Sequence, residues 1–547
     1  MVRLLPIGGL GEFGANSLVC DDEVAGRLVI DVGAAFFEEP VLGVSHQVPD
    51  FAAIGGPPPQ AVVLSHAHDD HCKGLGVLLG AWPGTVVAGS RATVTWCRSA
   101  GLARRSSFTE LAAATPFVAG GWVVDALPVS HSIPGTLALR LRAGGMTAVL
   151  ATDMRLTPSA LGEQTPADRL AAWGREGVDV LLLDATNALV TTPPPSEAAV
   201  GTALGELIRA ASGLVVVVTF ASHLGRFSQV ARAAAASGRV VVPIGRGLIE
   251  ALAVQARLGG LGAPVGLVRS YRELPRLPRD GVVAVVTGSQ GEAGSAFTRL
   301  ATGRLPGLAL RGGDCVLHAA RLIPGNERRL AGLFDLCVRQ GARVVTASEA
   351  PIHASGHPHR QELVELCDLL RPRAVVPVHG WRRHLETVAE LARGAGAATV
   401  VADNGDELVW TASGLEPSGR RRATGRLSFG DGENDLVEAG VVHERRVLAR
   451  SGVLVAVVES AGGAVPRVHL HSAGLRLGAE VEEELAAGLR GEAARGLGGV
   501  RVDRDDVRLT MERWLKREVR RRCGQRPAVL VSVPADDPPS TGGERPS

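Results

Sequence analysis

The sequence is poor in aromatic residues, and its charges nearly balance. Aromatic side chains make up 3% of the 547 residues, with a single tyrosine, so we expect no aromatic platform for stacking nucleic-acid bases. Lysine and arginine number 58 against 56 aspartates and glutamates, and the net charge of +2 excludes a protein that attracts polyanions over its whole surface. Any contact with nucleic acid must therefore depend on a local patch.

Signals for secretion and membrane insertion are also scarce. No apolar run approaches the ~20 residues that a membrane helix requires, and the N-terminus shows neither the basic region nor the apolar region of a secretory signal. The seven cysteines are dispersed without any CxxC spacing, which fits reduced thiols better than a disulfide framework. We therefore expect a cytoplasmic protein without a membrane partner.

What the sequence does contain is an α/β pattern. Short β-branched runs alternate with helical stretches rich in alanine and leucine, and 46% hydrophobic residues are enough for large cores. Loops at strand ends are where α/β proteins build sites, because the rigid sheet aims the side chains that follow it. Residues capable of chemistry that directly follow predicted strands are His66, Asp153, Asp184 and His379.

The chain length suggests about three domains. Three consecutive prolines at residues 193–195 break the first α/β pattern, and a second pattern follows them. A stretch rich in glycine, serine and arginine indicates a linker further on. The predicted parts are a first domain (residues 1–193 and 350–415), an inserted domain (194–349), a linker (416–437), a small α+β C-terminal domain (438–534) and a disordered tail (535–547).

The strongest local signal is an HxHxDH pattern directly after an apolar strand. His66, His68, Asp70 and His71 supply three imidazoles and a carboxylate within six residues, a mixture of nitrogen and oxygen ligands that zinc accepts. A histidine-rich surface loop is the alternative interpretation. The preceding strand and the distant partners described next favour a metal site.

One such cluster cannot complete two metal sites, so ligands from other strand ends are needed. His131, Asp153 and His379 stand at suitable positions, although each alone would more often be structural. Asp31, at the end of another predicted strand, is a candidate to orient a ligand histidine. The assigned ligands are His66, His68 and His131 for one zinc ion, Asp70, His71 and His379 for the other, and Asp153 as the bridge between them.

Two zinc ions ~3.5–4 Å apart can activate a shared water and stabilise both oxygens of an in-line displacement at phosphorus. This chemistry needs no serine or cysteine nucleophile, and the sequence has no GxSxG motif to supply one. Manganese or magnesium could take the place of zinc in the working enzyme.

These motifs resemble the metallo-β-lactamase superfamily and, within its β-CASP branch, the bacterial ribonuclease J family. The resemblance covers most of the chain. It implies an αββα sandwich, an inserted β-CASP domain and a small C-terminal domain. The matching segments are GGLGEFGANS (8–17), IDVG (30–33), VPDF (48–51), LSHAHDDH (64–71), SHSIP (130–134), DATN (184–187), TFAS (219–222), TGSQGE (287–292), IPGNE (323–327), HASGH (353–357) and PVHG (377–380).

The resemblance implies roles that the metal pattern alone does not give. His357, paired with Asp184, would be the general acid near the leaving oxygen, a task that suits an imidazole; a phosphate-contacting or structural histidine is the alternative. Asp70 is assigned to the catalytic set as well as to the metal. The loop of His353, Ala354, Ser355, Gly356 and His357 would contact a substrate phosphate, with Gly356 allowing close approach of its backbone.

The resemblance also implies a pocket for the 5′ end of RNA, formed by Ser222, Ser289, Gln290 and Glu292. An ordinary turn is the alternative interpretation of these segments. Neutral donors would suit a 5′-monophosphate better than a triphosphate. The implied function is a zinc-dependent ribonuclease with 5′-to-3′ exonuclease activity, and endonuclease activity as a second mode, in RNA maturation and decay.

Further expectations also come from the resemblance. His379 at the third β-CASP motif favours single-stranded RNA over DNA. The C-terminal domain implies a homodimer or homotetramer, and an RNA-degradation complex is a candidate partner. The sequence departs from the family pattern at Gly135, His223 and Trp381, which puts substrate positioning in question more than metal binding.

Competing interpretations remain open. A small-molecule hydrolase would share the HxHxDH signal but would have no need of the inserted domain, and an inactive RNA-processing subunit would have no need of all seven ligands. The GxGxxG pattern at residues 9–14 would suit a dinucleotide site only if a helix followed, and residues 15–22 predict a strand instead. Basic runs at residues 420–422 and 516–522 could touch RNA phosphates but are more often solvated.

Overall fold

The structure, a computed structural model, describes residues 1–37, 41–102, 106–262, 264–323, 325–430, 435–459, 465–475, 477–497 and 503–533. It divides into two compact units. Unit 1 comprises Met1–Phe36 and Gln47–Arg426, and unit 2 comprises Phe37–His46 and Leu427–Ser547. The predicted tail at residues 535–547 lies outside the described residues.

Unit 1 begins with a mixed sheet whose strand order is β21-β20-β1-β2-β3-β5-β6-β7. The first three strands along the chain form an antiparallel meander, and β3, β5, β6 and β7 then run parallel. The bounds are β1 (Val2–Gly8), β2 (Ser17–Asp22), β3 (Gly26–Ile30), β5 (Ala61–Leu64), β6 (Val86–Gly89), β7 (Phe108–Glu110), β20 (Asp406–Thr411) and β21 (Gly414–Arg421). The segment between β3 and β5 holds β4 (His46–Pro49).

A second sheet lies against the first, in the order β19-β18-β12-β11-β10-β9-β8. Strands β8 to β11 are antiparallel neighbours, whereas β12 runs parallel to both β11 and β18. The bounds are β8 (Phe117–Ala119), β9 (Trp122–Pro128), β10 (Leu137–Ala143), β11 (Met146–Ala151), β12 (Val180–Asp184), β18 (Ala374–Val378) and β19 (Ala398–Thr399).

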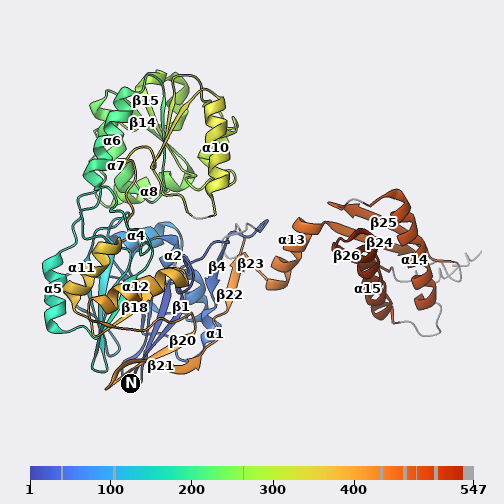
Figure 1. Cartoon of the computed structure of the whole chain (residues 1–547), viewed down its shortest axis with the longest axis horizontal. Coiled ribbons are helices and arrows are strands. Elements are labelled where there is room, and N and C mark those ends of the chain that lie inside the picture. The colour runs from blue at the N-terminus through green and yellow to red at the C-terminus, as the bar shows by residue number, and fades with distance from the viewer. Residues whose placement is uncertain are drawn as a thin grey trace, which may run out of the picture. The chain divides into compact units, whose positions relative to one another are not determined.

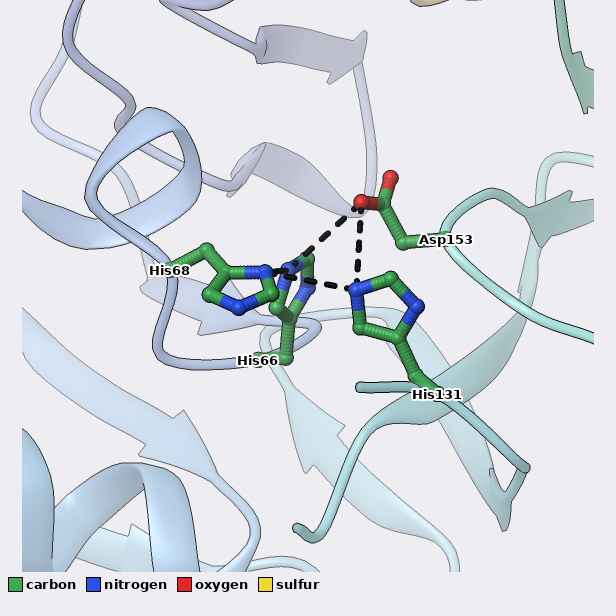
Figure 2. Close-up of side chains that lie close together, drawn as sticks. All are labelled: His66, His68, His131 and Asp153. Carbon is green, nitrogen blue, oxygen red and sulfur yellow. Dashed lines mark hydrogen bonds and ion pairs between the residues drawn. The ribbon is translucent and has the colours of Figure 1, made fainter. Parts of the chain in front are cut away.

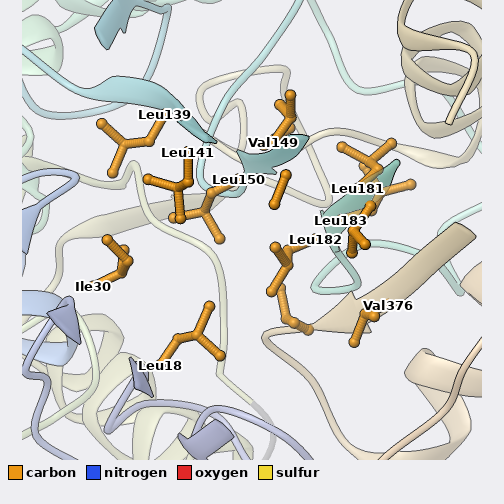
Figure 3. Close-up of a cluster of buried hydrophobic side chains, with 14 of the residues drawn as sticks. Leu18, Ile30, Leu139, Leu141, Val149, Leu150, Leu181, Leu182, Leu183 and Val376 are labelled. Carbon is orange, nitrogen blue, oxygen red and sulfur yellow. The ribbon is translucent and has the colours of Figure 1, made fainter. Parts of the chain in front are cut away.

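The main core fills the space between these sheets. Leu18 and Ile30 of the first sheet pack with Leu139, Leu150 and Leu182 of the second in one buried cluster (Figure 3). Helices cover the outer faces, because the alternate residues of each strand are also apolar. The covering helices are α1 (Phe51–Ile54), α3 (Leu75–Ala81) and α4 (Arg91–Ser99) on the first sheet, and α5 (Ala167–Glu176), α11 (Arg360–Leu370) and α12 (Arg382–Gly394) on the second.

The inserted domain is a parallel sheet with helices on both faces, drawn in green in Figure 1. Its strand order is β14-β15-β13-β16-β17. Valines of β13 alternate between the two faces, so Val215 and Val217 pack in one cluster and Val216 and Val218 in the other. The strands are β13 (Val215–Val218), β14 (Val240–Ile244), β15 (Val282–Val286), β16 (Cys315–His318) and β17 (Arg343–Thr346). The helices are α6 (Glu197–Ala210), α7 (Leu224–Ala236), α8 (Arg246–Arg257), η1 (Tyr271–Arg276), η2 (Arg279–Gly281), α9 (Ala296–Ala301) and α10 (Glu327–Arg339).

Unit 2 has its own core, in which Leu454 and Ala456 pack with Leu485, Met511 and Leu515. A sheet of order β25-β24-β26 forms one side of this core. The elements are β22 (Arg426–Phe429), β23 (Leu436–Val437), α13 (Ala439–Ser451), β24 (Val453–Glu459), β25 (Arg467–Ala473), α14 (Ala479–Leu497), α15 (Arg504–Cys523) and β26 (Ala528–Ser532).

The segment expected to be a linker, residues 416–437, is partly regular strand. Strand β21 continues to Arg421 by pairing with β20, and β22 pairs with β23. The residues of β21 from Glu416 to Arg421 are mostly exposed, so a polar composition does not oppose strand pairing there. Within the part of the chain that is described, no helix is long and apolar enough to cross a membrane.

Candidate metal centre and active site

The HxHxDH segment leaves β5 and turns into the short helix α2 (Asp69–Cys72), with His68 at its N-cap. The backbone that follows β3 holds this helix, because Val32 N–H donates to the His71 carbonyl (2.8 Å) and Ala34 N–H to the Asp69 carbonyl (3.0 Å). A Cβ atom on Gly33 would lie 1.7 Å from the Asp70 carbonyl oxygen. Only glycine therefore allows this close approach.

The first group of candidate ligands is His66, His68, His131 and Asp153, brought together from three loops (Figure 2). The Nε2 atoms of His66 and His131 lie 3.0 and 3.3 Å from His68 Nδ1. They lie 3.7 and 3.6 Å from Asp153 Oδ2. Three imidazole nitrogens and one carboxylate oxygen thus converge in the manner of a tetrahedral zinc site.

The second group is Asp70, His71 and His379, and Asp153 faces it as well. Asp70 Oδ2 lies 3.6 Å from His71 Nε2 and 3.2 Å from His379 Nε2. Asp153 Oδ1 lies 3.3 and 3.8 Å from the same two nitrogens. Among the described residues, this buried oxygen has no hydrogen-bond partner. A metal ion would satisfy it, so the residues present fit a pair of ions that share Asp153.

The far side of four of the five ligand imidazoles is held by a hydrogen bond, which fixes the ring and leaves the other nitrogen for a metal. His71 Nδ1 lies 2.8 Å from Asp31 Oδ2, and His131 Nδ1 lies 2.9 Å from the Gly356 carbonyl oxygen. Asp31 therefore lies beside a candidate ligand, in a position to orient its ring as expected from the sequence. The two remaining contacts are His66 Nδ1 to Ser65 Oγ (3.0 Å) and His379 Nδ1 to Thr186 Oγ1 (2.6 Å).

Backbone strain is concentrated at this centre. Asp31, Asp153 and His379 have positive φ angles of 56, 51 and 62°, a region that non-glycine residues seldom occupy. The glycine-rich loop after β1 supports one of them, because His379 N–H donates to the Gly9 carbonyl oxygen (2.8 Å). Strand β2 follows this loop, so the loop lacks the helix that a dinucleotide site requires.

The electrostatics of the centre couple metal binding to proton release. Burial would raise the pKa of the Asp153 carboxyl, but His71 and His379 hold it well below its usual range. Burial lowers the pKa of His131 to about 3, so this imidazole is neutral. Burial opposes protonation of His379 too, yet Asp153 and Asp70 raise its pKa to about 9. Protons therefore compensate the carboxylates in the second group, and a metal ion has to displace them.

Asp184 and His357 adjoin the second group. His357 Nδ1 lies 2.8 Å from Asp184 Oδ2, and the same oxygen accepts from Asp153 N–H (3.0 Å). Asp184 is fully buried at the end of β12, whereas His357 remains partly exposed. The carboxylate thus holds one imidazole nitrogen and leaves the other free to exchange a proton with a bound molecule.

The residues of the loop at 353–357 differ in their burial and contacts, so they cannot all contact a substrate. The side chain of Ala354 is buried in the core of the inserted domain, so it cannot face a substrate. A Cβ atom on Gly356 would lie 2.6 Å from His131 Nδ1. Glycine is therefore needed at this position because His131 packs closely against the backbone. The sequence had suggested instead that a substrate approaches the backbone there. Ser355 Oγ accepts from Asn187 Nδ2 (3.0 Å).

A buried ion pair that the sequence analysis did not identify ties this loop to the metal loops. Arg155 Nε donates to Glu362 Oε2 (2.7 Å), and Arg155 Nη1 donates to the Ser355 carbonyl oxygen (2.9 Å). The N–H of Arg155 also donates to the Ser130 carbonyl oxygen (2.8 Å), beside His131. These two partners of Arg155 lie 200 and 207 positions further along the chain, so no local pattern could reveal the contacts.

The residues predicted to hold a 5′ end lie at the carboxyl ends of neighbouring strands of the inserted sheet. Ser222 follows β13, and Ser289 and Gln290 follow β15, which pairs with β13. Ser289 is buried, and Glu292 is exposed, with Oε2 accepting from Gln290 N–H (3.1 Å). Gln290 Nε2 donates to the Arg321 carbonyl oxygen (2.8 Å).

The three departures from the family pattern have structural roles. Gly135 has a φ of 75°, and a Cβ atom there would lie 2.7 Å from the side chains of Ala92 and Ser90. His223 caps α7, because its Nδ1 accepts from Arg226 N–H (3.2 Å). Trp381 is the N-cap of α12 and packs on Phe13, with ring centroids 5.1 Å apart.

Three family models match the chain. They are a beta-lactamase superfamily domain at residues 27–224, the beta-CASP domain of ribonuclease J at residues 212–336, and a Zn-dependent metallo-hydrolase RNA specificity domain at residues 344–402. Fold and site together define a metallo-β-lactamase-type hydrolase with an inserted β-CASP domain.

Curated relatives make the assignment more specific. The chain is 33% identical to a ribonuclease J from Mycolicibacterium smegmatis over 97% of both proteins, and 34% identical to one from Sinorhizobium meliloti over 83% of this chain and 82% of that protein. The chain belongs to the ribonuclease J family. A solved structure of a protein of unknown function from Enterococcus faecalis shares the fold at 15% identity, with a TM-score of 0.54 over 74% of this chain and 99% of that chain.

Proposed function

We propose that the protein is a zinc-dependent ribonuclease that removes nucleotides from the 5′ end of single-stranded RNA and can also cleave internally. The observation that carries the proposal is that Asp153 turns one carboxylate oxygen toward each of the two ligand groups. The β-CASP and RNA-specificity matches support RNA as the substrate class. Two zinc ions bound there would supply Lewis-acid activation of a water molecule and of the scissile phosphate.

The residues of the chain divide the remaining work. Asp153 would hold both ions through its two oxygens, while His66, His68, His131, Asp70, His71 and His379 complete the two sites. His357 would give a proton to the leaving oxygen of the RNA, and Asp184 would keep its ring in place through the 2.8 Å contact. Ser355 and His353 would contact a phosphate of the bound strand.

The exonuclease mode requires a site that fixes the 5′ end. Ser289, Ser222 and Gln290 would hold a terminal monophosphate, and Glu292 would fix the backbone of their loop. The hydroxyl of Ser289 supports this role, because in the described part of the chain it is buried and has no hydrogen-bond partner. A bound phosphate oxygen would complete it.

The test combines metal analysis with RNA degradation. Purified protein should contain close to two zinc ions per chain, and 5′-monophosphorylated RNA should release single nucleotides from its 5′ end. The matched substrates are 5′-triphosphorylated RNA, circular RNA of the same sequence and single-stranded DNA. Equal rates on RNA and DNA, or protein that is fully active without divalent metal, would contradict the proposal. Reconstitution with manganese or magnesium identifies the working metal.

The assembly state belongs to the same proposal. We expect a cytoplasmic homodimer or homotetramer that associates through the C-terminal domain and joins an RNA-degradation complex. Light scattering of the full chain and of a chain ending at residue 430 should show larger particles only for the full chain. A truncated chain that still forms the same oligomer would refute this part.

A further inference from the structure

An arginine outside every motif described above lies between the proposed 5′-end pocket and the metal centre. Arg321 follows β16 in the inserted domain and is partly exposed. Its carbonyl oxygen accepts from Gln290 Nε2 (2.8 Å), which belongs to the pocket. Its guanidinium donates to Asn187 Oδ1 on the other side of the domain boundary. One residue therefore touches both halves of the proposed active site.

The contacts of Asn187 place the guanidinium beside the loop at residues 353–357. Asn187 Nδ2 donates to Ser355 Oγ (3.0 Å) and to the His357 carbonyl oxygen (3.0 Å). The charge of Arg321 also acts on His353, where it adds to the burial that lowers the pKa of that imidazole to about 3. Burial lowers the pKa of Arg321, and the carboxylate of Asp184 opposes this shift.

The charge of Arg321 is opposed only by Asp184, which forms no ion pair with it in the described part of the chain. Within the described residues, no carboxylate lies at salt-bridge distance from it. Arg226, the other arginine that acts on His353, differs in this respect, because it is fully buried and its Nη1 lies 2.9 Å from Glu197 Oε2. A guanidinium carries five N–H donors in a planar fork that suits phosphate, and a contact to one amide oxygen leaves most of them free.

Neighbouring groups are also incomplete. Thr219 Oγ1, His223 Nε2, Ser289 Oγ and His353 Nδ1 are buried and, across the described ranges, lack hydrogen-bond partners. Thr219 and Ser289 follow adjacent strands, and the rings of His223 and His353 lie 6.5 Å apart. Unpaired polar atoms beside an unpaired cation indicate a site that is completed by an anionic ligand.

We propose that Arg321 binds the 5′-terminal phosphate of the RNA and sets the preference for a phosphorylated end. The inference rests on the proposed ribonuclease function and adds a cation to a pocket otherwise built from neutral donors. A terminal phosphate carries about −1.5 to −2 charges at neutral pH, whereas a diester carries one. The guanidinium therefore distinguishes a phosphorylated 5′ end from a hydroxyl end and from an internal linkage.

The experiment compares Arg321→Gln, Arg321→Lys and wild type on three RNAs of one sequence, with a 5′-monophosphate, with a 5′-hydroxyl, and circular. Arg321→Gln should lower kcat/KM on the monophosphate by about 10- to 100-fold, the value of a hydrogen bond to a charged group. It should change cleavage of the other two RNAs little, and Arg321→Lys should retain most of the preference. Arg339→Gln, at an exposed arginine that ends α10, is the matched control and should behave as wild type.

Two outcomes separate this inference from its alternatives. If Arg321 only positions Asn187, then Arg321→Gln and Asn187→Ala will impair all three RNAs equally, which overturns the inference. A second measurement is calorimetric binding of a nucleoside 5′-monophosphate and of the matching nucleoside, which needs no cleavage. Arg321→Gln should weaken only the former, and equal binding of the monophosphate by both proteins would refute the proposal. A wild type that binds the monophosphate but cleaves no RNA would refute the ribonuclease function instead.

Discussion

The metal-binding loops and the facing strand ends of the inserted domain differ in how completely their polar side chains are hydrogen-bonded. In the metal domain, the rear nitrogen of His66, His71, His131 and His379 meets a specific oxygen of the protein. In the inserted domain, Thr219, His223, Ser289 and His353 keep buried atoms without a partner, as judged over the described residues. In the first region the protein itself therefore orients the imidazoles and leaves Asp153 Oδ1 for a metal ion, whereas in the second region several polar groups would be completed only by a ligand.

This difference follows from the task of each region. A metal site has to fix ligand geometry closely, so outer contacts and backbone strain are retained there. A substrate pocket has to release its product after each cleavage, and groups that are satisfied only in the complex suit that purpose. Changes in the metal domain should therefore abolish function, whereas changes in the inserted domain should alter preference.

The largest effect is expected from Asp153→Ala. This substitution removes one ligand from each proposed zinc site, whereas His68→Ala removes a ligand from one site only. The metal content should therefore fall further in Asp153→Ala. Ribonuclease activity should fall by about three orders of magnitude, since ~4 kcal/mol of transition-state stabilisation is lost. Elemental analysis of both purified variants checks this. Two metal ions per chain in Asp153→Ala would show that the bridging assignment is incorrect.

His357→Ala tests the group beside the metals. We expect kcat to fall by about 100- to 1000-fold, as for loss of a general acid, with zinc content unchanged because His357 belongs to neither assigned site. Asp184→Asn should cause a smaller loss through a misoriented ring. The pH–rate profile of wild type should have a limb that is absent in His357→Ala. An unaltered profile would favour a role in phosphate contact.

Arg155→Ala should act through stability. The change removes the guanidinium from the buried carboxylate of Glu362, which keeps its contacts to Leu156 N–H and His359 Nδ1, so the loss should be about 1.5–3 kcal/mol. The double variant Arg155→Met with Glu362→Gln leaves no unpaired charge and keeps an acceptor for Leu156 N–H, so it should recover most of that loss. Urea unfolding followed by fluorescence, together with activity, measures both. Recovery of stability without recovery of activity would show that the pair also positions the loop at residues 353–357.

Ser289→Ala should leave the metal centre untouched and change only the use of 5′ ends. Loss of one hydrogen bond to a charged group corresponds to about 10- to 100-fold in exonucleolytic rate on 5′-monophosphorylated RNA. Internal cleavage of circular RNA serves as the control and should be nearly unchanged. A variant that is impaired equally on both substrates would place Ser289 outside the 5′-end pocket.

The smallest effect concerns acid stability. Burial lowers the pKa of His353 to about 3 in the folded protein, against about 6.5 when unfolded. The unfolded chain therefore takes up a proton first, so the stability that depends on neutral His353 is complete above about pH 6.5 and is lost as the pH falls toward 3. At pH 5.5 the lost stability amounts to ~1.4 kcal/mol. Between pH 7.5 and 5.5 the free energy of unfolding should fall less in His353→Asn than in wild type. An equal fall in both proteins would show that His353 does not cause the loss.

The sequence predicted the class of fold, and the structure brings the seven proposed ligands together. The prediction was possible because each ligand follows the end of a strand that a short apolar run marks in the sequence. Residues 374–378, for example, form β18 as expected, and His379 comes next. Asn16, which lies 3.0 Å from His71 Nε2, and Thr186 stood within matching motifs without an assigned role. Roles that depend on distant partners were not predictable, because neither Arg155 nor Arg321 belongs to a local pattern. Composition also misled at residues 416–421, where exposure on an edge strand tolerates polar residues.

The order of the ligands along the chain has a consequence for biosynthesis. The first ligand group lies wholly before the inserted domain, whereas the second needs His379, which is translated after it. A nascent chain that ends within the inserted domain therefore lacks His379 of the second cluster, and it also lacks Gly356, whose carbonyl oxygen orients His131 of the first. Arrested nascent chains that end before residue 379 should accordingly cut no RNA, so the cell is spared an active nuclease emerging beside its own messenger.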